Sequence, residues 1–390
     1  MSETIATADP STSTRGDEPL LVVDDLKTYF ETPPGLVKAV DGISFELERG
    51  RTLGIVGESG CGKTVASRSI MGLVQKHGIQ RHGSVRFEGR EILGLRDRTM
   101  RDLWGAQLAM VFQDPMTSLN PVVKIGRQIT ESLRHHLDVS RTYANELAVA
   151  LLESVGIPEP DRRMKEYPHQ LSGGMRQRVM IAIALACGPK LLFADEPTTA
   201  LDVTVQAQIL DLLDAQQRDR FMAVALVTHD LGVVAGRTDE IAVMYAGKIV
   251  EKAPTKTLFE NVRMPYTEAL LRSIPKLSDA SHTRLAVIPG RPPSLVSPPQ
   301  GCNFAPRCPY AQDKCRVDEP PLMKSGFPGH TYACWFPVGT PEGAAALARN
   351  QRETQLGASS TLDRAAGYST AASSSDDGAE NSAPDPAGGA

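Results

Sequence analysis

The feature that most constrains the fold is a glycine-rich segment, residues 57–64, which reads Gly-Glu-Ser-Gly-Cys-Gly-Lys-Thr. It fits the G-x-x-x-x-G-K-[ST] pattern of phosphate-binding loops. The apolar stretch Thr52–Val56 precedes it and predicts a buried strand, and a helix is expected from Lys63 to about Val74. A strand, a glycine loop and a helix in this order begin an α/β unit, so a nucleotide-binding α/β domain is expected.

The residue types of this loop match the chemistry of a triphosphate. Glycines let several backbone N–H groups point at one anion, and the following helix presents its positive N-terminal end. We expect Lys63 to reach the β- and γ-phosphates and the Thr64 hydroxyl to ligate Mg²⁺. The ATP-binding residues predicted here are Gly57, Glu58, Ser59, Gly60, Cys61, Gly62, Lys63 and Thr64.

Two adjacent carboxylates end a second apolar strand. The stretch Leu191–Asp195 is apolar up to Asp195, and Glu196 follows it. Parallel strands deliver functional groups at their C-terminal ends, so both acids are expected beside the phosphate loop. Asp195 suits the Mg²⁺ shell, directly or through a water. Glu196 suits the polarisation of a water for in-line attack on the γ-phosphate.

A third motif points to one family. Residues 171–178 read Leu-Ser-Gly-Gly-Met-Arg-Gln-Arg and lie upstream of the two acids. Together with the phosphate loop, this motif resembles the ATPase subunit of an ABC transporter over about residues 21–272. Met175 stands where many members of that family have Gln, a departure that leaves Ser-Gly-Gly intact. The resemblance implies an α/β fold of the P-loop NTPase class, with a RecA-like core, a helical subdomain and an antiparallel β subdomain.

The resemblance also implies roles for residues outside these motifs. Phe30 would stack on adenine, with Tyr29 as its competitor. Gln113 would sense Mg²⁺ and face the membrane subunits, and His229 would contact the γ-phosphate as a second catalytic residue beside Glu196. The Mg²⁺ residues expected on this basis are Thr64, Gln113 and Asp195.

In the family that the chain resembles, ATP lies between two subunits. The resemblance implies that the phosphate loop of one subunit faces Ser172, Gly173 and Gly174 of the other. Asp202, in the sequence Thr-Ala-Leu-Asp, would belong to the loop that crosses the interface. The second ATPase subunit is expected to be a related but distinct chain, which makes the pair a heterodimer.

Four of the six cysteines crowd into one segment with the spacing C-x₅-C-x₆-C-x₁₈-C: Cys302, Cys308, Cys315 and Cys334. This spacing does not match common zinc sites or ferredoxin runs, yet four thiols in a small Pro-rich segment could close around one metal centre. Zinc, disulfides and free thiols are the alternatives to a cluster. Cys61 and Cys187 lie outside the group and are interpreted as small buried or loop residues.

The cysteine segment resembles the C-terminal extension of the dipeptide/oligopeptide (and nickel) importer branch of ABC ATPases. The residues that carry the resemblance are Gly-Cys-x-Phe-x-Pro-Arg-Cys from Gly301 to Cys308, then a later Cys, His330 and Cys334. Members with all four cysteines are associated with a 4Fe–4S cluster, so the resemblance implies such a cluster here. His330 is interpreted as structural.

Composition divides the chain into four parts. Residues 1–19 are predicted to be a disordered tail, 20–272 the ABC ATPase domain, 273–342 the cysteine-bearing extension, and 343–390 a disordered acidic tail rich in Ala, Ser and Gly. The net charge of −4 falls within residues 351–390, so no basic field is expected and nucleic acid is not predicted as a partner. The longest apolar run is too short for a membrane-spanning helix, and no secretory signal is visible.

These observations and the resemblance predict the ATP-binding and ATP-hydrolysing subunit of an ABC-type importer of di- or oligopeptides. It is expected on the cytoplasmic face of the cell membrane, bound to two permease subunits, with an extracytoplasmic peptide-binding protein delivering substrate. Nickel or another solute is the alternative cargo. Alternatives of other classes are a non-transport ABC ATPase, disfavoured by the single phosphate loop, and a redox-sensing regulatory protein.

Overall fold

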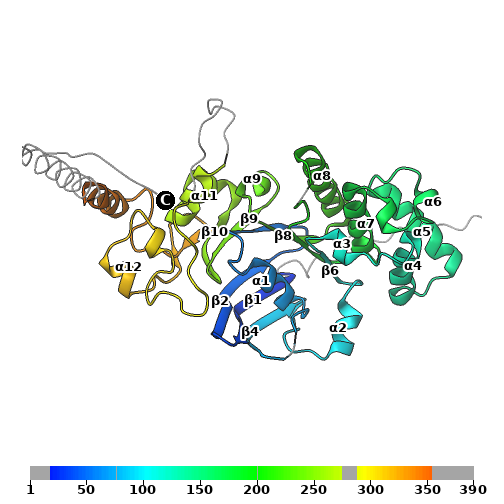
Figure 1. Ribbon diagram of the computed structural model, residues 1–390, viewed down its shortest axis with the longest axis horizontal. Helices are drawn as coiled ribbons and strands as arrows, with labels where there is room; N and C mark the ends of the chain where they lie inside the picture. The colour runs from blue at the N-terminus through cyan, green and yellow to red at the C-terminus, as the bar shows by residue number, and fades with distance from the viewer. Residues whose placement is uncertain (1–17, 76, 200, 275–287, 354–390) are drawn as a thin grey trace, which may run out of the picture.

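The computed structural model describes residues 18–75, 77–199, 201–274 and 288–353. Figure 1 shows an elongated molecule in which helices α4 to α7 gather at one end and the segment around α12 lies at the other. The strands of the central sheet run between these ends, and β1, β2 and β4 form a separate layer beside α1. Within the described residues, no helix combines the length and apolarity needed to cross a membrane.

The larger sheet has eight strands in the order β11-β12-β10-β9-β3-β8-β7-β6. From β9 through β3, β8 and β7 to β6 the strands are parallel. Strands β3, β6, β7 and β8 are buried at every position, as expected for parallel strands that are covered on both faces. The strands are β3 (Thr52–Val56), β6 (Leu108–Val111), β7 (Leu191–Asp195), β8 (Ala223–Thr228), β9 (Glu240–Tyr245), β10 (Lys248–Pro254), β11 (Met323–Lys324) and β12 (Thr331–Tyr332).

The smaller sheet has four strands in the order β2-β1-β4-β5, and neighbouring strands are antiparallel. It packs on the helix that follows the phosphate loop, where the buried Thr28 of β1 donates a hydrogen bond from its hydroxyl to Ser69 Oγ of α1 at 2.9 Å. Its strands are β1 (Leu21–Thr32), β2 (Gly35–Leu47), β4 (Ile79–Phe87) and β5 (Arg90–Glu91).

Helices cover the central sheet and build a separate helical region after β6. In the middle of α7, the apolar residues Val179, Met180, Ile181 and Ala182 are all buried. The α-helices are α1 (Lys63–Ile70), α2 (Asp97–Leu103), α3 (Pro115–Ser118), α4 (Ile125–His136), α5 (Arg141–Ser154), α6 (Pro160–Arg163), α7 (Gly173–Leu185), α8 (Val203–Arg220), α9 (Leu231–Val234), α10 (Thr255–Glu260), α11 (Pro265–Arg272) and α12 (Asp313–Val317). Short 3₁₀ helices span Pro168–Gln170 and Ala305–Arg307.

A parallel core, a helical region and an antiparallel β layer are all present, so the predicted fold class is confirmed. Strands β9 and β10 form a hairpin and are joined by Ala246 and Gly247, both at positive φ. Two positive-φ residues make the tight turn whose twist suits antiparallel strands.

The cysteine-bearing extension is not a separate body. Its strand β12 pairs with β10, placing Tyr332 opposite Glu251, and β11 adds a further strand outside it. At the same join, His330 Nε2 lies 2.9 Å from Glu251 Oε1, and both side chains are fully buried. The predicted structural role of His330 fits this contact.

An aromatic cluster fastens the extension to the ATPase domain. Phe304 of the extension packs edge-on against Tyr245 at the end of β9 and Tyr266 of α11, with ring centroids 5.3 and 5.4 Å apart. Each of the three rings is almost fully buried. Large buried aromatic surfaces dominate packing energies, so this cluster is a main source of cohesion between the two regions.

Ordered structure continues beyond the predicted start of the acidic tail at residue 343. Residues 341–353 are helical, and Ala346 is fully buried. Asn350 Nδ2 donates hydrogen bonds to the carbonyls of Pro309 and Ala311, which ties this helix to the cysteine segment. The alanines that suggested low complexity are also strong helix formers, which explains the difference. The remainder of that tail and residues 1–17 of the N-terminal tail lie outside the described residues.

Candidate functional site

The phosphate loop runs from the end of β3 to the start of α1, and its glycines are required by close packing. A Cβ atom at Gly57 would lie 2.2 Å from the carbonyl oxygen of Met244. A Cβ at Gly62, which caps α1 with a φ of 107°, would lie 2.2 Å from the carbonyl oxygen of Ala39. The loop therefore approaches neighbouring backbone on two sides, and only glycine fits at either position.

The lysine of the loop is buried and folded back on it. Lys63 Nζ donates hydrogen bonds to the carbonyl oxygens of Gly57 at 2.7 Å and Glu58 at 3.2 Å. The same nitrogen lies 3.8 Å from Glu196 Oε1, and only 4% of the Lys63 side chain is exposed. The ammonium group thus stands between the loop backbone and the carboxylate that follows β7.

Thr64 and Asp195 form the second contact of the site. The Thr64 hydroxyl donates a hydrogen bond to Asp195 Oδ1 at 3.0 Å, and Asp195 Oδ2 is buried without a hydrogen-bond partner. Burial raises the pKa of Asp195 above its ordinary value, and the Thr64 hydrogen bond opposes that rise. A hydroxyl beside an unpartnered carboxylate oxygen is a donor set that suits Mg²⁺, so these residues fit the predicted metal.

Three strand ends converge on Glu196. Its Oε2 accepts hydrogen bonds from Gln113 Nε2, after β6, and from Thr199 Oγ1, both at 3.0 Å. Nδ1 of His229, after β8, lies 3.4 Å from the same oxygen. The Glu196 backbone adopts a left-handed conformation with a φ of 47°, which carries strain in a residue with a side chain. The structure therefore brings the predicted residues Gln113, Glu196 and His229 together.

The predicted adenine-stacking residue lies on strand β1. Successive residues of a strand face opposite sides, so Phe30 shares a face with Thr28, which points to α1, and Tyr29 faces the other way. The Tyr29 hydroxyl is bound to Asp41. This placement favours Phe30 over Tyr29, and its contact with adenine stays a prediction.

The remaining predicted residues form a second group at the starts of α7 and α8. Ser172 caps α7 and accepts a hydrogen bond from Met175 N, while Asp202 caps α8 and accepts one from Val205 N. A Cβ at Gly174 would lie 3.0 Å from Val205, so the starts of the two helices touch. Among the described residues, no hydrogen bond or ion pair joins Ser172 or Asp202 to the phosphate loop of the same chain. The predicted nucleotide residues thus fall into two groups, the phosphate-loop half and the α7–α8 half of the candidate site.

The sequence did not predict the roles of three residues that contact the phosphate loop or Glu196. Thr199 belongs to the Thr-Ala-Leu-Asp segment, so its nearness to Glu196 in sequence was a signal for its role. Tyr266 carries no local signal. Arg307 belongs to the cysteine motif of the extension, but that motif does not indicate its contact with Glu58 in a distant segment.

The four cysteines of the extension line one small enclosed cavity together with Phe304, Tyr310 and Trp335. All four are free thiols, and burial raises the pKa of Cys308 to about 12. In the part of the chain that is described, no three His, Cys, Asp or Glu side chains are arranged to hold one metal ion. Thiols alone are a suitable donor set for an iron–sulfur cluster, and the four share one cavity. Because no three of them are arranged around one metal ion, the cluster stays a prediction.

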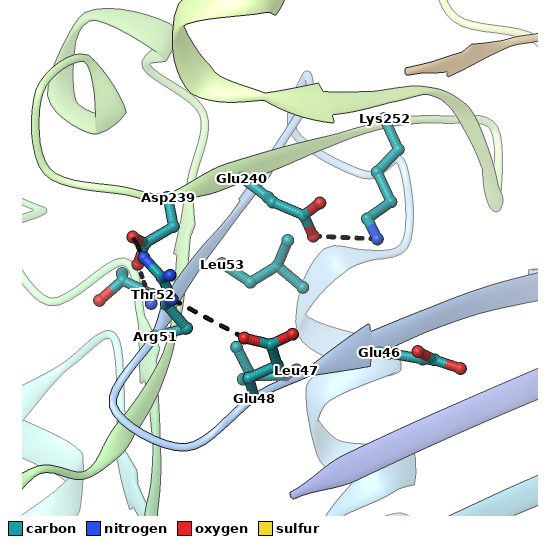
Figure 2. Close-up of a pocket in the computed structure, with 9 residues that line it drawn as sticks. All are labelled: Glu46, Leu47, Glu48, Arg51, Thr52, Leu53, Asp239, Glu240 and Lys252. Carbon is teal, nitrogen blue, oxygen red and sulfur yellow. Dashed lines mark hydrogen bonds and ion pairs between the residues drawn. The ribbon is translucent and has the colours of Figure 1, made fainter. Parts of the chain in front are cut away.

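A polar cavity of about 360 Å³ lies at the opposite end of β3 from the phosphate loop, beside Thr52. Figure 2 shows two ion pairs among its charged side chains, Arg51 with Asp239 at 2.7 Å and Lys252 with Glu240 at 3.0 Å. Asp239 Oδ2 also accepts a hydrogen bond from Thr52 N. Ligands of parallel α/β sheets bind at the carboxyl ends of the strands, so this cavity is not a candidate for the nucleotide.

A basic groove of about 790 Å³ lies among α4, α5 and α6. Asp161 is the acidic side chain that lines it, and within the described part of the chain its cations form no ion pair. Such a groove is complementary to an acidic partner surface. The cationic side chains of this basic groove are Lys124, Arg127, Arg134, Arg141 and Lys165.

Known families and proteins match both parts of the chain. Residues 40–199 match the family described as ABC transporter, and residues 250–315 match the oligopeptide/dipeptide transporter C-terminal region. The chain is 49% identical over 330 residues to the oligopeptide transport ATP-binding protein OppD of Salmonella typhimurium, covering 84% of this chain and 97% of that protein. It is 49% identical over 321 residues to the dipeptide transport ATP-binding protein DppD of Bacillus subtilis, covering 82% and 95%.

Solved structures support the same fold. The dimeric structure of MJ0796, a bacterial ABC transporter cassette, has a TM-score of 0.55 and 25% sequence identity, over 60% of this chain and 98% of that one. With relatives of 49% identity that span most of its length, the chain belongs to the ABC transporter family of ATPases, in the branch that carries the oligopeptide/dipeptide transporter C-terminal region.

Proposed function

We propose that this chain hydrolyses ATP to energise the import of di- or oligopeptides across the cytoplasmic membrane. The observation that carries the ATPase part is the convergence of Gln113, Glu196 and His229 beside Lys63. The relatives named for oligopeptide and dipeptide transport support the peptide cargo, because the matches to this chain cover almost the full length of those relatives. Nickel is the alternative cargo.

In this proposal the loop residues bind the phosphates, and Glu196 acts as the general base for the attacking water. The backbone N–H groups of residues 57–64 and the Lys63 ammonium bind the β- and γ-phosphates. Glu196, held on Oε2 by Gln113 and Thr199, accepts a proton from the water as it attacks, and His229 contacts the γ-phosphate. Thr64, Asp195 and Gln113 would hold Mg²⁺, which when bound neutralises charge on the phosphate oxygens.

The two halves of the site support a dimer as the working form. Ser172, Gly173 and Gly174 at the start of α7 would cover the nucleotide held by the partner's phosphate loop, with Asp202 at the interface. The helix N-terminus then adds its dipole to the binding of the γ-phosphate. We propose that the second subunit is a related but distinct ATPase chain.

We propose that the basic groove receives an acidic segment of a membrane permease. The lining of the groove begins at Val122, a short way along the chain from Gln113. A segment bound there would be connected through α3 to Gln113, which contacts Glu196. Two permease subunits would then hold the ATPase pair at the cytoplasmic face of the membrane. A peptide-binding protein on the other side would deliver the substrate.

We also propose a 4Fe–4S cluster on Cys302, Cys308, Cys315 and Cys334. What supports it is the donor set, four thiols around one cavity, because thiolates alone suit iron–sulfur centres. Anaerobic purification with iron and acid-labile sulfide assays tests it. Iron and sulfide in equal amounts support the cluster, whereas zinc without sulfide rejects it.

The test of the transport function is peptide uptake in a strain that lacks the chain. Uptake of labelled di- and oligopeptides is expected to be lost on deletion and restored by the wild-type chain but not by Glu196→Gln. Nickel uptake, measured in the same strain, is expected to stay unchanged. Loss of nickel uptake with peptide uptake intact would reject the peptide cargo and leave the ATPase assignment standing.

A further inference from the structure

A side chain of the extension reaches into the phosphate loop. Arg307, in the short helix Ala305–Arg307 between Cys302 and Cys308, meets Glu58, the second residue of the loop. Its two terminal nitrogens donate hydrogen bonds to the two carboxylate oxygens of Glu58 at 2.6 and 2.9 Å. Only 3% of the Arg307 side chain is exposed. A bidentate pair of this kind fixes the relative orientation of the guanidinium and the carboxylate as well as the distance between them.

The guanidinium of Arg307 is held on its other sides by fixed groups. Nε donates to the carbonyl oxygen of Pro289 at 2.8 Å, and Nη2 to that of Ile288 at 3.3 Å. Its carbon lies 5.9 Å from the ring centroids of both Tyr245 and Phe304, which belong to the buried aromatic cluster. The position of Arg307 is therefore set by the extension and the cluster, and Glu58 conforms to it.

The backbone of Glu58 is held as well. Its N–H donates a hydrogen bond to the hydroxyl of Tyr266 at 2.8 Å, and its carbonyl accepts one from Lys63. Tyr266 is fully buried and packs on Phe304. The second residue of the loop is thus fixed through its side chain and its backbone by residues from α11 and the extension.

Electrostatics explains how the contact between Arg307 and Glu58 would favour ATP binding. The loop must accept the negative phosphates of ATP, and a carboxylate free to turn toward them would repel them. The pairing with Arg307 cancels the charge of Glu58 and turns its carboxylate toward the extension. Loss of Arg307 would release that carboxylate close to the anion site.

We propose that Arg307 is a positioning residue for ATP: by pairing with Glu58 it holds the phosphate loop in its binding shape and removes a repelling charge. It does not touch the nucleotide. The extension thereby becomes a part of the ATP site, and the cysteine segment that carries Arg307 is coupled to nucleotide affinity.

The test is a double-substitution cycle on the full chain, with MgATP affinity measured by equilibrium binding of a fluorescent ATP analogue. Arg307→Gln is expected to weaken binding about tenfold, the size of a direct coupling between neighbours. Arg307→Gln with Glu58→Gln is expected to recover the part of that loss that comes from repulsion, because no free carboxylate remains. In the assembled transporter, KM for ATP is expected to rise in Arg307→Gln with a smaller change in kcat.

Arg316→Gln, an exposed arginine of the same extension, is the matched control and is expected to bind MgATP as the wild type does. The proposal is overturned if Arg307→Gln binds MgATP normally. It is equally overturned if the double variant is as weak as the single one, since a merely structural role predicts no recovery.

A second measurement needs no variant and so does not depend on folding of Arg307→Gln. Coupling between two sites is reciprocal, so MgATP binding to the wild-type chain is expected to slow amide hydrogen exchange within residues 302–308. Unchanged exchange in that segment at saturating MgATP would overturn the proposal.

Discussion

At the scale of single residues, the site is organised around one carboxylate. Oε2 of Glu196 accepts from Gln113 and Thr199, while Oε1 faces Lys63. Each of these residues follows a parallel strand or lies in the phosphate loop, so the topology alone brings them together at the carboxyl ends of the strands. Hydrogen bonds to the ionised carboxylate orient it for a water and keep it ready as a base.

Substitution of Glu196 separates binding from hydrolysis. Glu196→Gln is expected to retain MgATP affinity and to lower turnover about 10²–10⁴-fold, the usual effect of losing a general base. Phosphate release and nucleotide binding, measured on the same preparation, test both parts. Glu153→Gln, an exposed residue of α5, serves as the control, and near-normal turnover of Glu196→Gln would reject the assignment.

Asp195 makes the nucleotide-free chain sensitive to pH. Because burial raises the pKa of Asp195, the folded chain holds this proton more tightly than the unfolded chain does. The contribution of Asp195 to stability is therefore most favourable below its unfolded value of 3.8 and is lost as the pH rises through the raised folded pKa.

Asp195→Asn removes the free-energy cost of burying a carboxylate at this position at neutral pH. Without nucleotide, the variant is expected to raise the free energy of unfolding by about 1 kcal/mol, in the range for an unsatisfied buried group. It is also expected to lose the additional stability that MgATP gives the wild type. Denaturant unfolding with and without MgATP measures both, and a variant less stable than the wild type without nucleotide would contradict the argument.

The sequence predicted most of this site because its motifs are local. A glycine loop after a strand, or two acids at the end of one, places its own residues by backbone geometry alone. Tyr266 and Arg307 reach Glu58 from segments far along the chain, and nothing near them in the sequence indicates the contact. Their recognition requires the register of the sheet and the packing of the extension on it.

At the scale of elements, the join between the ATPase domain and the extension is the least expected feature. Composition changes after residue 273, so the sequence predicts a boundary there, yet β12 extends the sheet of the ATPase domain through β10. Strands of two residues leave no hydrophobic pattern to detect. The helix at residues 341–353 was missed for the opposite reason, since its alanines also indicate low complexity.

The aromatic cluster predicts where this join is strongest. Phe304→Ala is expected to lower the free energy of unfolding by about 3–5 kcal/mol, because it opens a cavity between Tyr245 and Tyr266. Thermal or denaturant unfolding measures the loss. Phe327→Ala, which removes a ring that is 37% exposed in the same extension, is expected to change stability by less than about 1 kcal/mol. Equal losses in the two variants would contradict the role of the cluster.

At the scale of the whole molecule, the basic groove, which we propose to receive a permease, and the cysteine-bearing extension belong to different regions. Figure 1 places α4 to α6, which form the groove, at the opposite end from the extension. The phosphate loop and the parallel strands lie between them. If the groove binds a permease as proposed, partner contacts at one end and the Arg307–Glu58 pair at the other would both act on the phosphate loop between them.

Charge reversal in the groove is expected to uncouple the chain from its permeases. Arg127→Glu with Arg134→Glu places acids opposite the acidic segment that we propose, and like charges at an interface cost several kcal/mol. Co-purification with the permeases is expected to fall at least about tenfold, while MgATP affinity of the isolated chain stays at the wild-type level. Arg98→Glu with Arg101→Glu on α2 is the matched control, and an equal loss there would reject the groove as the docking surface.

The short strands of the extension also decide how far the chain can be cut back. A fragment that ends at residue 274 would leave β10 as an open sheet edge, with its outer N–H and C=O groups unpaired and Glu251 deprived of His330. Exposed edges recruit strands from other molecules, so such a fragment is expected to self-associate and precipitate. The smallest soluble ATPase that can be prepared from this chain is therefore expected to include the cysteine segment.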